Sequence, residues 1–358
     1  MISFSRNRNL AGRGLTFALL MLLAAALLQA CGGAASGNQT GKPSNNGAVT
    51  STGTEGAGAV DSKSEVPAVL NYGYIGSNEL NLPGGAEGWG LYKGIIQEEL
   101  KKHGIEQIVL TGFPNGPDQT ESLISGRIDV GGLGDTPAII AYASGAKTRL
   151  INQTNITNIA YLLTTAEGPK TIEELAGKTI SIQKGSYMHR YVVGLLKQAG
   201  VADYKLVHML SPDGQAALTR GDVDAMTNSG FPAHKLLADG YTLIDSSSSH
   251  PELHGTSVTV AAESYLEKFP DFPKVWNEAR QKALEDLQQH EEEYYQFIAD
   301  LNKTTVELAK KVSPISEISE QSFVEEGIKR ISGTKDFLVE EGLAKKDFSI
   351  EEWALKVE

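Results

Sequence analysis

The sequence predicts an α/β protein made of two doubly wound, mostly parallel sheets. Three observations predict this fold class. Short apolar stretches typical of strands alternate with amphipathic helical segments, which is the pattern of parallel sheets flanked by helices. The alternation runs through two successive rounds, about 66–151 and 171–244. The chain has 358 residues and is 41% hydrophobic, which is enough for two domains of about 100–200 residues each.

Residues 1–30 are predicted to be a lipoprotein signal peptide. Three arginines precede an apolar stretch that begins near Leu15, as in secretory signals, and the stretch is too short to span a bilayer comfortably. It ends in Leu-Gln-Ala-Cys at 28–31, which resembles a lipobox, and Cys31 is the only cysteine. The resemblance implies cleavage before Cys31 and lipidation of its thiol. The alternative is an ordinary signal peptide followed by an incidental cysteine.

Residues 31–65 are predicted to be a flexible tether. They are mostly Gly, Ala, Ser, Thr and Asn, so they bury too little surface to offset the entropy of ordering. Loss of the three arginines in 1–30 lowers the net charge from −12 to −15, which argues against binding to nucleic acid. Attachment to the extracytoplasmic face of the bacterial cell membrane would therefore depend on the lipid at Cys31.

The first round of the predicted fold begins with a strand near Val69. The next segment is helical because Leu91, Ile95, Ile96 and Leu100 lie on one helical face. The predicted order is strand 69–75, helix 91–103, strand 108–110, helix 116–124, strand 128–130, helix 138–144 and strand 149–151.

The second round begins at a capping-box sequence near Thr171. Its predicted elements are helix 171–175, strand 179–182, helix 186–199, strand 204–208, helix 214–219, strand 223–226, helix 231–238 and strand 241–244. A returning strand follows at 256–261, and the pattern is helical from Ser264 onward. These last helices are expected to cover the first domain.

Three segments share the order strand, small-residue turn, helix start: Phe113–Pro117, Gly132–Pro137 and Lys184–His189. In the second, Thr136 suits the N-cap and Pro137 the first helical position. Each segment leaves backbone N–H groups and the positive end of a helix dipole free to bind an anion. Such turns lie at the carboxyl ends of parallel strands, where open sheets bind ligands.

These segments, taken in order, resemble one family. Residues 122–138 resemble the first-domain signature of the nitrate/sulfonate/taurine (NMT1/THI5-like) substrate-binding proteins of ABC transporters. Residues 184–189 resemble the opening of that family's second domain, and 216–225 a later helix–strand step. The resemblance implies a two-lobed periplasmic-binding-protein fold of type II. Lobe I would comprise 66–160 and 255–358, and lobe II 161–254.

The resemblance also implies a set of ligand-binding residues in a cleft between the lobes. Two departures from the family's pattern add residues: the long loop 76–89, and the segment 228–233, where the family often carries Trp and Asp-Pro. The expected set is Asn78, Trp89, Asn115, Gly116, Asp135, Thr136, Ser186, Tyr187, His189, Gly230 and Phe231. Three alternatives stay open: Asp135 as a turn former, His189 on a helix surface, and the aromatic side chains in the core.

The implied function is capture of a small oxyanion-bearing solute, first of all an aliphatic sulfonate or taurine, and its delivery to an ABC permease. We expect no cofactor, no metal site and no enzyme activity. Enzymatic relatives use a cysteine-rich metal-binding stretch, and no cysteine follows Cys31. No zinc-protease motif, P-loop or nucleophile elbow is present either. The alternatives are a thiamine-pyrimidine-precursor binding protein or enzyme on the same fold, and a surface lipoprotein without a transport role.

Overall fold

The computed structural model describes residues 66–356. The predicted signal peptide, most of the predicted tether and Cys31 lie outside these residues and remain predictions. Within the described range, no helix is both long enough and apolar enough to cross a bilayer.

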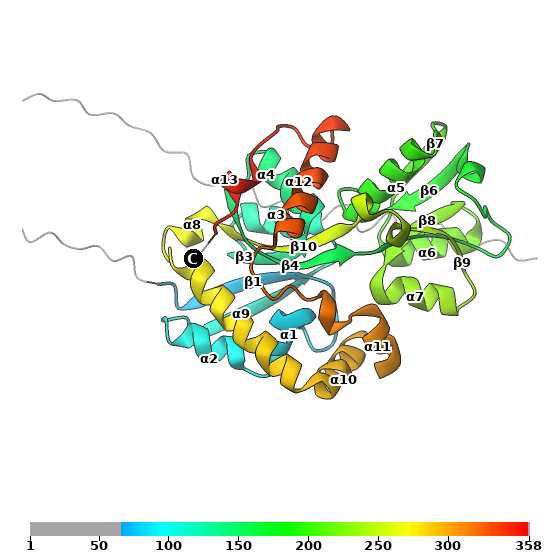
Figure 1. The fold of residues 1–358 in the computed structure, drawn as a ribbon. Helices are drawn as coiled ribbons and strands as arrows, with labels where there is room; N and C mark the ends of the chain where they lie inside the picture. Colours follow the sequence, from blue (N-terminus) through cyan, green and yellow to red (C-terminus); the bar gives the residue numbers. More distant parts are fainter. Residues whose placement is uncertain (1–65, 357–358) are drawn as a thin grey trace, which may run out of the picture. The chain divides into compact units, whose positions relative to one another are not determined.

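The first sheet has the strand order β2-β1-β3-β10-β4 (Figure 1). Its strands are β1 (Val69–Ile75), β2 (Gln107–Phe113), β3 (Val130–Gly134), β4 (Thr148–Asn158) and β10 (Gly255–Ala262). Four of them point in one direction, and β10 runs antiparallel to both of its neighbours. The sheet is thus assembled from one early stretch of chain and one late returning strand.

The second sheet has the order β7-β6-β8-β5-β9. Its strands are β5 (Ala160–Thr164), β6 (Lys178–Ile182), β7 (Tyr204–His208), β8 (Ala225–Ser229) and β9 (Thr242–Ser246). Here β5 is the reversed strand. The prediction of an α/β fold with two mostly parallel sheets is confirmed, although β5 was missed because it follows β4 with a single residue between them.

Five helices of the first sheet are α1 (Gly85–Tyr92), α2 (Ile95–Lys101), α3 (Gly116–Ile124), α4 (Asp135–Ala143) and α9 (Phe272–Gln289). The single helix predicted over 91–103 is in fact α1 and α2. They are separated at Gly94, whose φ of 79° is left-handed and favours glycine. Helix α9 lies along both α1 and α2.

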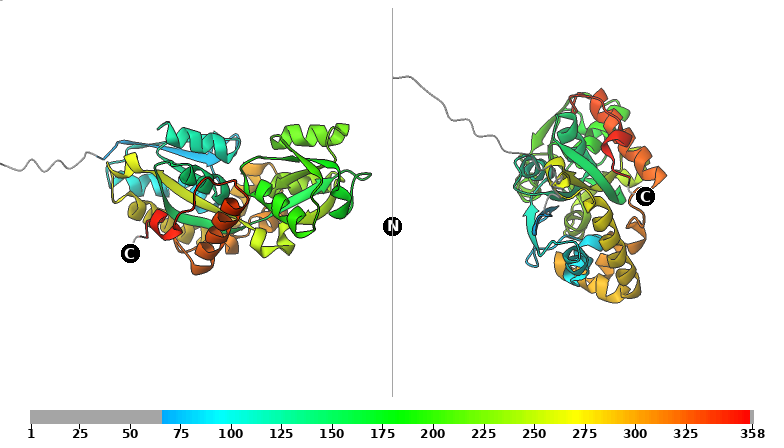
Figure 2. Two further views of the ribbon diagram at one scale, coloured as in Figure 1. Left: turned by 90° about the horizontal axis from the view of Figure 1, so that it is seen from above. Right: turned by 90° about the vertical axis from the view of Figure 1, so that its left-hand side faces the viewer.

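The remaining helices divide between the two sheets (Figure 2). Helices α5 (Tyr187–Gln198), α6 (Ser211–Arg220) and α7 (Gly230–Ala238) flank the second sheet. The C-terminal region adds α8 (Glu263–Leu266), α10 (Glu291–Asn302), α11 (Val306–Val312), α12 (Glu325–Glu340) and α13 (Ile350–Trp353). The short 3₁₀ turns are η1 (Glu173–Leu175), η2 (Ser247–Ser249), η3 (Pro251–Leu253) and η4 (Ile315–Glu317).

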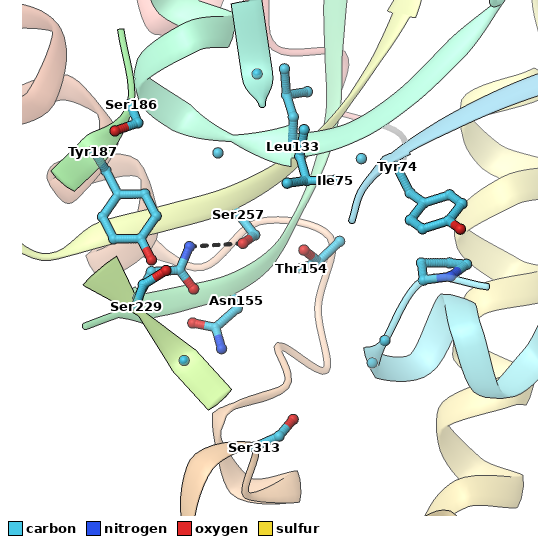
Figure 3. Close-up of a pocket in the computed structure, with 18 of the residues that line it drawn as sticks. Tyr74, Ile75, Leu133, Thr154, Asn155, Ser186, Tyr187, Ser229, Ser257 and Ser313 are labelled. Atoms are coloured by element: carbon cyan, nitrogen blue, oxygen red, sulfur yellow. Dashed lines mark hydrogen bonds between the residues drawn. The ribbon is translucent and has the colours of Figure 1, made fainter. Parts of the chain in front are cut away.

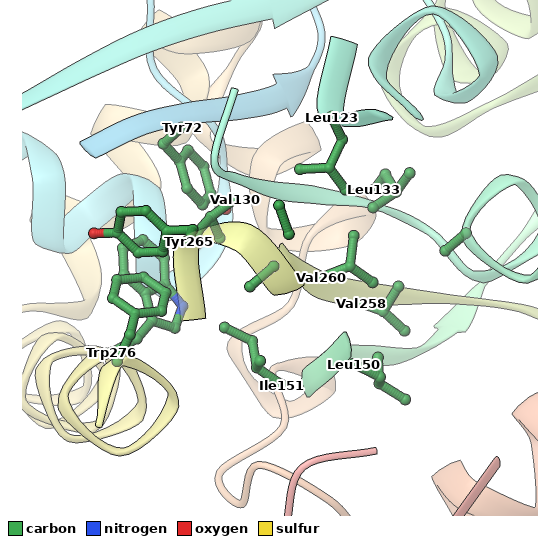
Figure 4. Close-up of a cluster of buried hydrophobic side chains, with 14 of the residues drawn as sticks. Tyr72, Leu123, Val130, Leu133, Leu150, Ile151, Val258, Val260, Tyr265 and Trp276 are labelled. Carbon is green, nitrogen blue, oxygen red and sulfur yellow. The ribbon is translucent and has the colours of Figure 1, made fainter. Parts of the chain in front are cut away.

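The core of the first sheet surrounds β1, β3 and β10 (Figure 4). Tyr72 of β1 stacks on Trp276 of α9 with ring centroids 5.0 Å apart. Val130 lies beside Tyr72 on the neighbouring strand, and Val258 lies farther along the cluster, near Leu150; both valines are fully buried. Each fully buried apolar side chain of this size stabilises the fold by about 1.5–3 kcal/mol. This core joins the late helix α9 to the first sheet.

Candidate functional site

A cavity of about 580 Å³ lies between the carboxyl ends of strands from both sheets. Ile75 ends β1, Gly134 ends β3 and Ser229 ends β8, and all three residues line the cavity. This is where open α/β sheets bind ligands, and the volume is that of a small-molecule site.

Within the described residues, six helices begin in the wall of this cavity. Their starting residues in the wall are Gly84 (α1), Asn115 (α3), Gly134 (α4), Ser186 (α5), Ser211 (α6) and Ser229 (α7). The first N–H groups of a helix have no acceptor within the helix, and the helix dipole places partial positive charge there. The wall is therefore suited to an anion.

Two of these helix starts carry side-chain caps. The Asn115 side chain accepts the N–H of Asp118 at 2.9 Å. Ser186 Oγ accepts the N–H of His189 at 3.3 Å and donates to the carbonyl of Gln183 at 2.7 Å. Each cap uses the third N–H of its helix, which leaves the first N–H group, that of Gly116 in α3 and that of Tyr187 in α5, without an acceptor inside the helix.

Tyr187 stands where the two sheets meet, with its hydroxyl beside Ser229 (Figure 3). Burial of the side chain raises the pKa of Tyr187 to about 12. The hydroxyl therefore stays protonated at neutral pH. The ring packs against Gly255, where β10 begins.

The other polar groups of the wall are mostly neutral. Asn158 donates to Ser257 Oγ at 2.8 Å, and Thr154 and Asn155 lie beside them on β4 (Figure 3). The amides of Gln183 and Asn228 also line the cavity. Among the described residues, no Lys, Arg or His lines it.

Six of the eleven predicted ligand residues line the cavity: Asn115, Gly116, Ser186, Tyr187, Gly230 and Phe231. Gly230 begins α7 with a φ of 53°, a left-handed conformation that other residues rarely adopt. The other five predicted residues, Asn78, Trp89, Asp135, Thr136 and His189, do not line the cavity.

Trp89 lies in the core, because the predicted loop 76–89 ends in helix α1. Its side chain is fully buried, and its indole N–H donates to Asp286 Oδ1 at 2.7 Å. Tyr294 and Phe297 meet its ring edge-to-face. Asn78 forms a turn instead, exchanging hydrogen bonds with the backbone of Leu82 at 2.8 and 3.3 Å.

Asp135 is fully buried and forms a brace inside the first sheet's body. Its carboxylate accepts hydrogen bonds from the hydroxyl of Thr136, from the N–H and hydroxyl of Thr256, and from the hydroxyl of Thr334. These bonds join α4 to β10 and α12, and they direct the carboxylate and Thr136 away from the cavity wall.

His189 lies on the buried side of α5. Its Nδ1 accepts the N–H of Gly185 at 3.3 Å, which closes the turn before the helix. Burial, together with the nearby Lys184, lowers the pKa of His189, so its ring is neutral at neutral pH. It therefore adds no positive charge near the cavity.

The cavity also contains residues that the sequence did not single out. The main ones are Asn155, Asn158, Gln183, Ser257 and Glu317. The sequence of β4 does contain a pattern that indicates these residues. The strand begins apolar, but its second half, 152–158, is Asn-Gln-Thr-Asn-Ile-Thr-Asn and is therefore polar. Within 66–356, no three His, Cys, Asp or Glu side chains are grouped so as to hold a metal ion.

Comparison with known proteins gives a family match. A family model described as NMT1/THI5 like matches residues 91–294, more than half of the chain. An aliphatic sulfonates-binding protein of Bacillus subtilis (strain 168) is 26% identical over 65% of this chain and 72% of its own length. One of Escherichia coli (strain K12) is 34% identical, over 35% of this chain and 40% of its own length.

Solved structures show the same fold. The alkanesulfonate-binding protein SsuA from Xanthomonas axonopodis pv. citri, bound to MOPS, has a TM-score of 0.67 at 20% identity, covering 81% of this chain and 99% of that one. The desulfurization enzyme DSZB has a TM-score of 0.62 at 16% identity, covering 80% of this chain and 96% of that one. The fold thus occurs in a binding protein and in an enzyme.

Proposed function

Because the chain belongs to the NMT1/THI5-like family, we propose that it is an extracytoplasmic solute-binding protein. It captures a small sulfonate, an alkanesulfonate or taurine, and delivers it to an ABC permease. The observation that carries the proposal is the set of six helix starts around one cavity, with neutral side-chain donors between them. A sulfonate is a tetrahedral anion with three acceptor oxygens, and helix starts bind such groups through backbone N–H donors.

The ligand would contact residues of both lobes. In lobe I, Asn115 and Gly116 supply the start of α3; in lobe II, Ser186 and Tyr187 supply the start of α5. A ligand that binds both walls stabilises the closed arrangement of the lobes relative to the open one. Lobe I would comprise 66–160 and 255–358, and lobe II 161–254. Cys31 would carry the lipid that anchors the protein to the membrane.

The enzyme alternative is an activity on a bound sulfur acid, as the shared fold with DSZB suggests. Binding is favoured here because the relatives reported above by sequence are binding proteins. In addition, the cavity wall offers no cysteine or histidine among the described residues. Release of sulfite or sulfate from a bound sulfonate would support the enzyme instead.

The proposal is tested by calorimetric titration of the full chain, purified in detergent, with alkanesulfonates, taurine, nitrate and thiamine-precursor pyrimidines. We expect saturable binding of a sulfonate at one site per chain and an increase in the melting temperature. Binding of the pyrimidines alone would favour the thiamine-precursor alternative. Absence of binding by every solute would contradict the proposal.

Replacing the cap Ser186 by Ala is expected to weaken sulfonate binding about tenfold, because the start of α5 would lose its fixed geometry. Loss of an N-cap also costs about 1 kcal/mol of stability. Thr305→Ala is a matched control, since Thr305 caps α11 through the N–H of Leu308 at 3.2 Å and does not line the cavity. It should lower stability by a similar amount and leave affinity unchanged. Equal affinities in titrations of the two variants would contradict a role for α5.

A further inference from the structure

The charged side chains of the cavity are both acidic. Among the described residues, Glu87 and Glu317 are the charged side chains in its wall. A ligand that carries only negative charge would therefore meet two carboxylates and no cationic side chain. Helix starts can hold the anionic end of a ligand, but they give no reason for a carboxylate elsewhere in the same wall.

The charge of Glu87 is already compensated. Its Oε1 accepts a hydrogen bond from Nε of Arg280 at 2.8 Å, and both side chains are nearly fully buried. The pair is an internal link between α1 and α9. Glu87 therefore has no free charge to offer to a ligand.

Glu317 differs from Glu87 in its surroundings. Within the described residues, no Lys, Arg or His lies within salt-bridge distance of it. Its neighbour is the neutral amide of Asn155, and its half-buried position raises the pKa of its carboxyl. Removing a carboxylate from water without a cationic partner is unfavourable. Glu317 is thus a partly desolvated acid that lacks a counter-ion and lies in a ligand cavity.

The position of Glu317 is fixed by the backbone. It ends the turn η4 (Ile315–Glu317), and the next residue, Ile318, forms a β-bridge with Asn155 of β4. Pro314 and Phe231 supply apolar surface in the same wall. The cavity therefore offers positive helix ends, apolar surface and one uncompensated carboxylate.

We propose that Glu317 binds a cationic group of the solute, so that the cavity takes a zwitterionic, ammonium-bearing alkanesulfonate in preference to a simple alkanesulfonate. This inference rests on the proposed function, because it assigns the other end of the same ligand. A sulfonate at the helix starts and an ammonium at Glu317 would satisfy both kinds of group in the wall. A hydrogen bond to a charged group contributes about 1.5–3 kcal/mol, which corresponds to a preference of roughly tenfold to a hundredfold.

The test is a titration of the full chain with matched pairs of solutes. The pairs are taurine with ethanesulfonate, and 3-aminopropanesulfonate with propanesulfonate, so that the members of each pair differ only in the amine. We expect the amine-bearing member of at least one pair to bind tenfold or more tightly. Two spacer lengths are used because the span from the helix starts to Glu317 selects the length.

The variant Glu317→Gln keeps the shape of the side chain and removes its charge. We expect it to lose the preference, by weakening the amino sulfonate and leaving the simple sulfonate equal or tighter. Glu320→Gln is the control, because Glu320 is exposed three residues away and outside the cavity wall. It makes the same change in net charge and should keep the preference. Melting temperatures of both variants check that they are folded.

Two outcomes would overturn the inference while leaving the proposed function intact. One is equal binding of both members of each pair by the unmodified chain. The other is a preference that survives in Glu317→Gln. Failure of every sulfonate to bind would overturn the proposed function and the inference together.

Discussion

Replacing Arg280 by Ala is expected to lower the free energy of unfolding by about 3–5 kcal/mol. The change leaves the carboxylate of Glu87 buried without its cationic partner, and such a charge costs about this much. Arg280 is 2% exposed and Glu87 is 5% exposed, so solvent cannot take over the role of the partner. The effect is measured by chemical denaturation, with the slope of the transition checked for a two-state process.

A second variant distinguishes the free-energy cost of leaving Glu87 unpaired from the contribution of the Glu87–Arg280 ion pair to stability. The double replacement Glu87→Met with Arg280→Met removes both charges and keeps apolar volume, so it should recover most of the lost stability. Lys282→Ala on the same helix is the matched control. Lys282 pairs with Glu99 at 2.6 Å but is half exposed, and surface pairs contribute less than about 1 kcal/mol. A loss below about 1 kcal/mol in Arg280→Ala would contradict the expected burial cost.

The Glu87–Arg280 ion pair also supports the wall of the cavity. Glu87 belongs to the first turn of α1, and Gly84 to Glu87 line the cavity wall. Arg280 also approaches the carbonyl of Thr154 at 3.5 Å, on the strand that carries Asn155 and Asn158. A change at Arg280 should therefore disturb two parts of the wall as well as the core.

Local sequence patterns predicted much of the fold. Alternation of strands and helices predicted both sheets, and the small-residue turns predicted three helix starts at the cavity. Predictions of this kind are correct because each depends on residues that lie close together in the chain. Capping at Asn115 and Ser186, for example, involves partners three residues away. The start of α4 was predicted two residues late, because its N-cap is Gly134 and not Thr136.

Helix α1 shows where local patterns fail. Its sequence, Gly-Ala-Glu-Gly-Trp-Gly-Leu-Tyr, contains three glycines, and most of it lies in the predicted loop 76–89. Two of the glycines serve close packing instead. A Cβ on Gly90 would lie 2.6 Å from the Cβ of Ala283 on α9, and one on Gly88 would lie 1.9 Å from the carbonyl oxygen of Pro83. Only the partner helix, far along the chain, shows why Trp89 is in the core.

Local patterns also misplace Asp135, which is predicted to contact the ligand but does not line the cavity. Beyond Thr136, its partners are Thr256 and Thr334, which are 121 and 199 residues away. A buried carboxylate that accepts several hydrogen bonds is a structural brace, but the motif around Asp135 resembles a ligand-binding turn equally well. The brace could not be recognised before its three elements were placed together.

Replacing Gly255 by Ala is expected to weaken sulfonate binding at least tenfold. The added Cβ would lie 2.6 Å from Cγ of Tyr187 and 2.7 Å from its Cδ2, distances that force the ring to move. Movement of the ring takes its hydroxyl away from Ser229 and changes the wall where the two sheets meet. Overpacking of this kind also costs about 1–3 kcal/mol of stability.

Gly333→Ala is the control for adding a methyl group. Gly333 lies in α12, and apart from its chain neighbours and the backbone of its own helix no heavy atom lies within 4 Å of the added Cβ. The change should therefore leave affinity unaltered and raise stability by about 0.5–1 kcal/mol. Tyr187→Ala combined with Gly255→Ala tests the mechanism, because removing the ring relieves the clash. Stability should then return while affinity stays low, since the ring itself forms part of the wall. If the double variant recovered affinity, or if Gly255→Ala bound sulfonate normally, Tyr187 would be a packing residue of the junction and not a ligand contact.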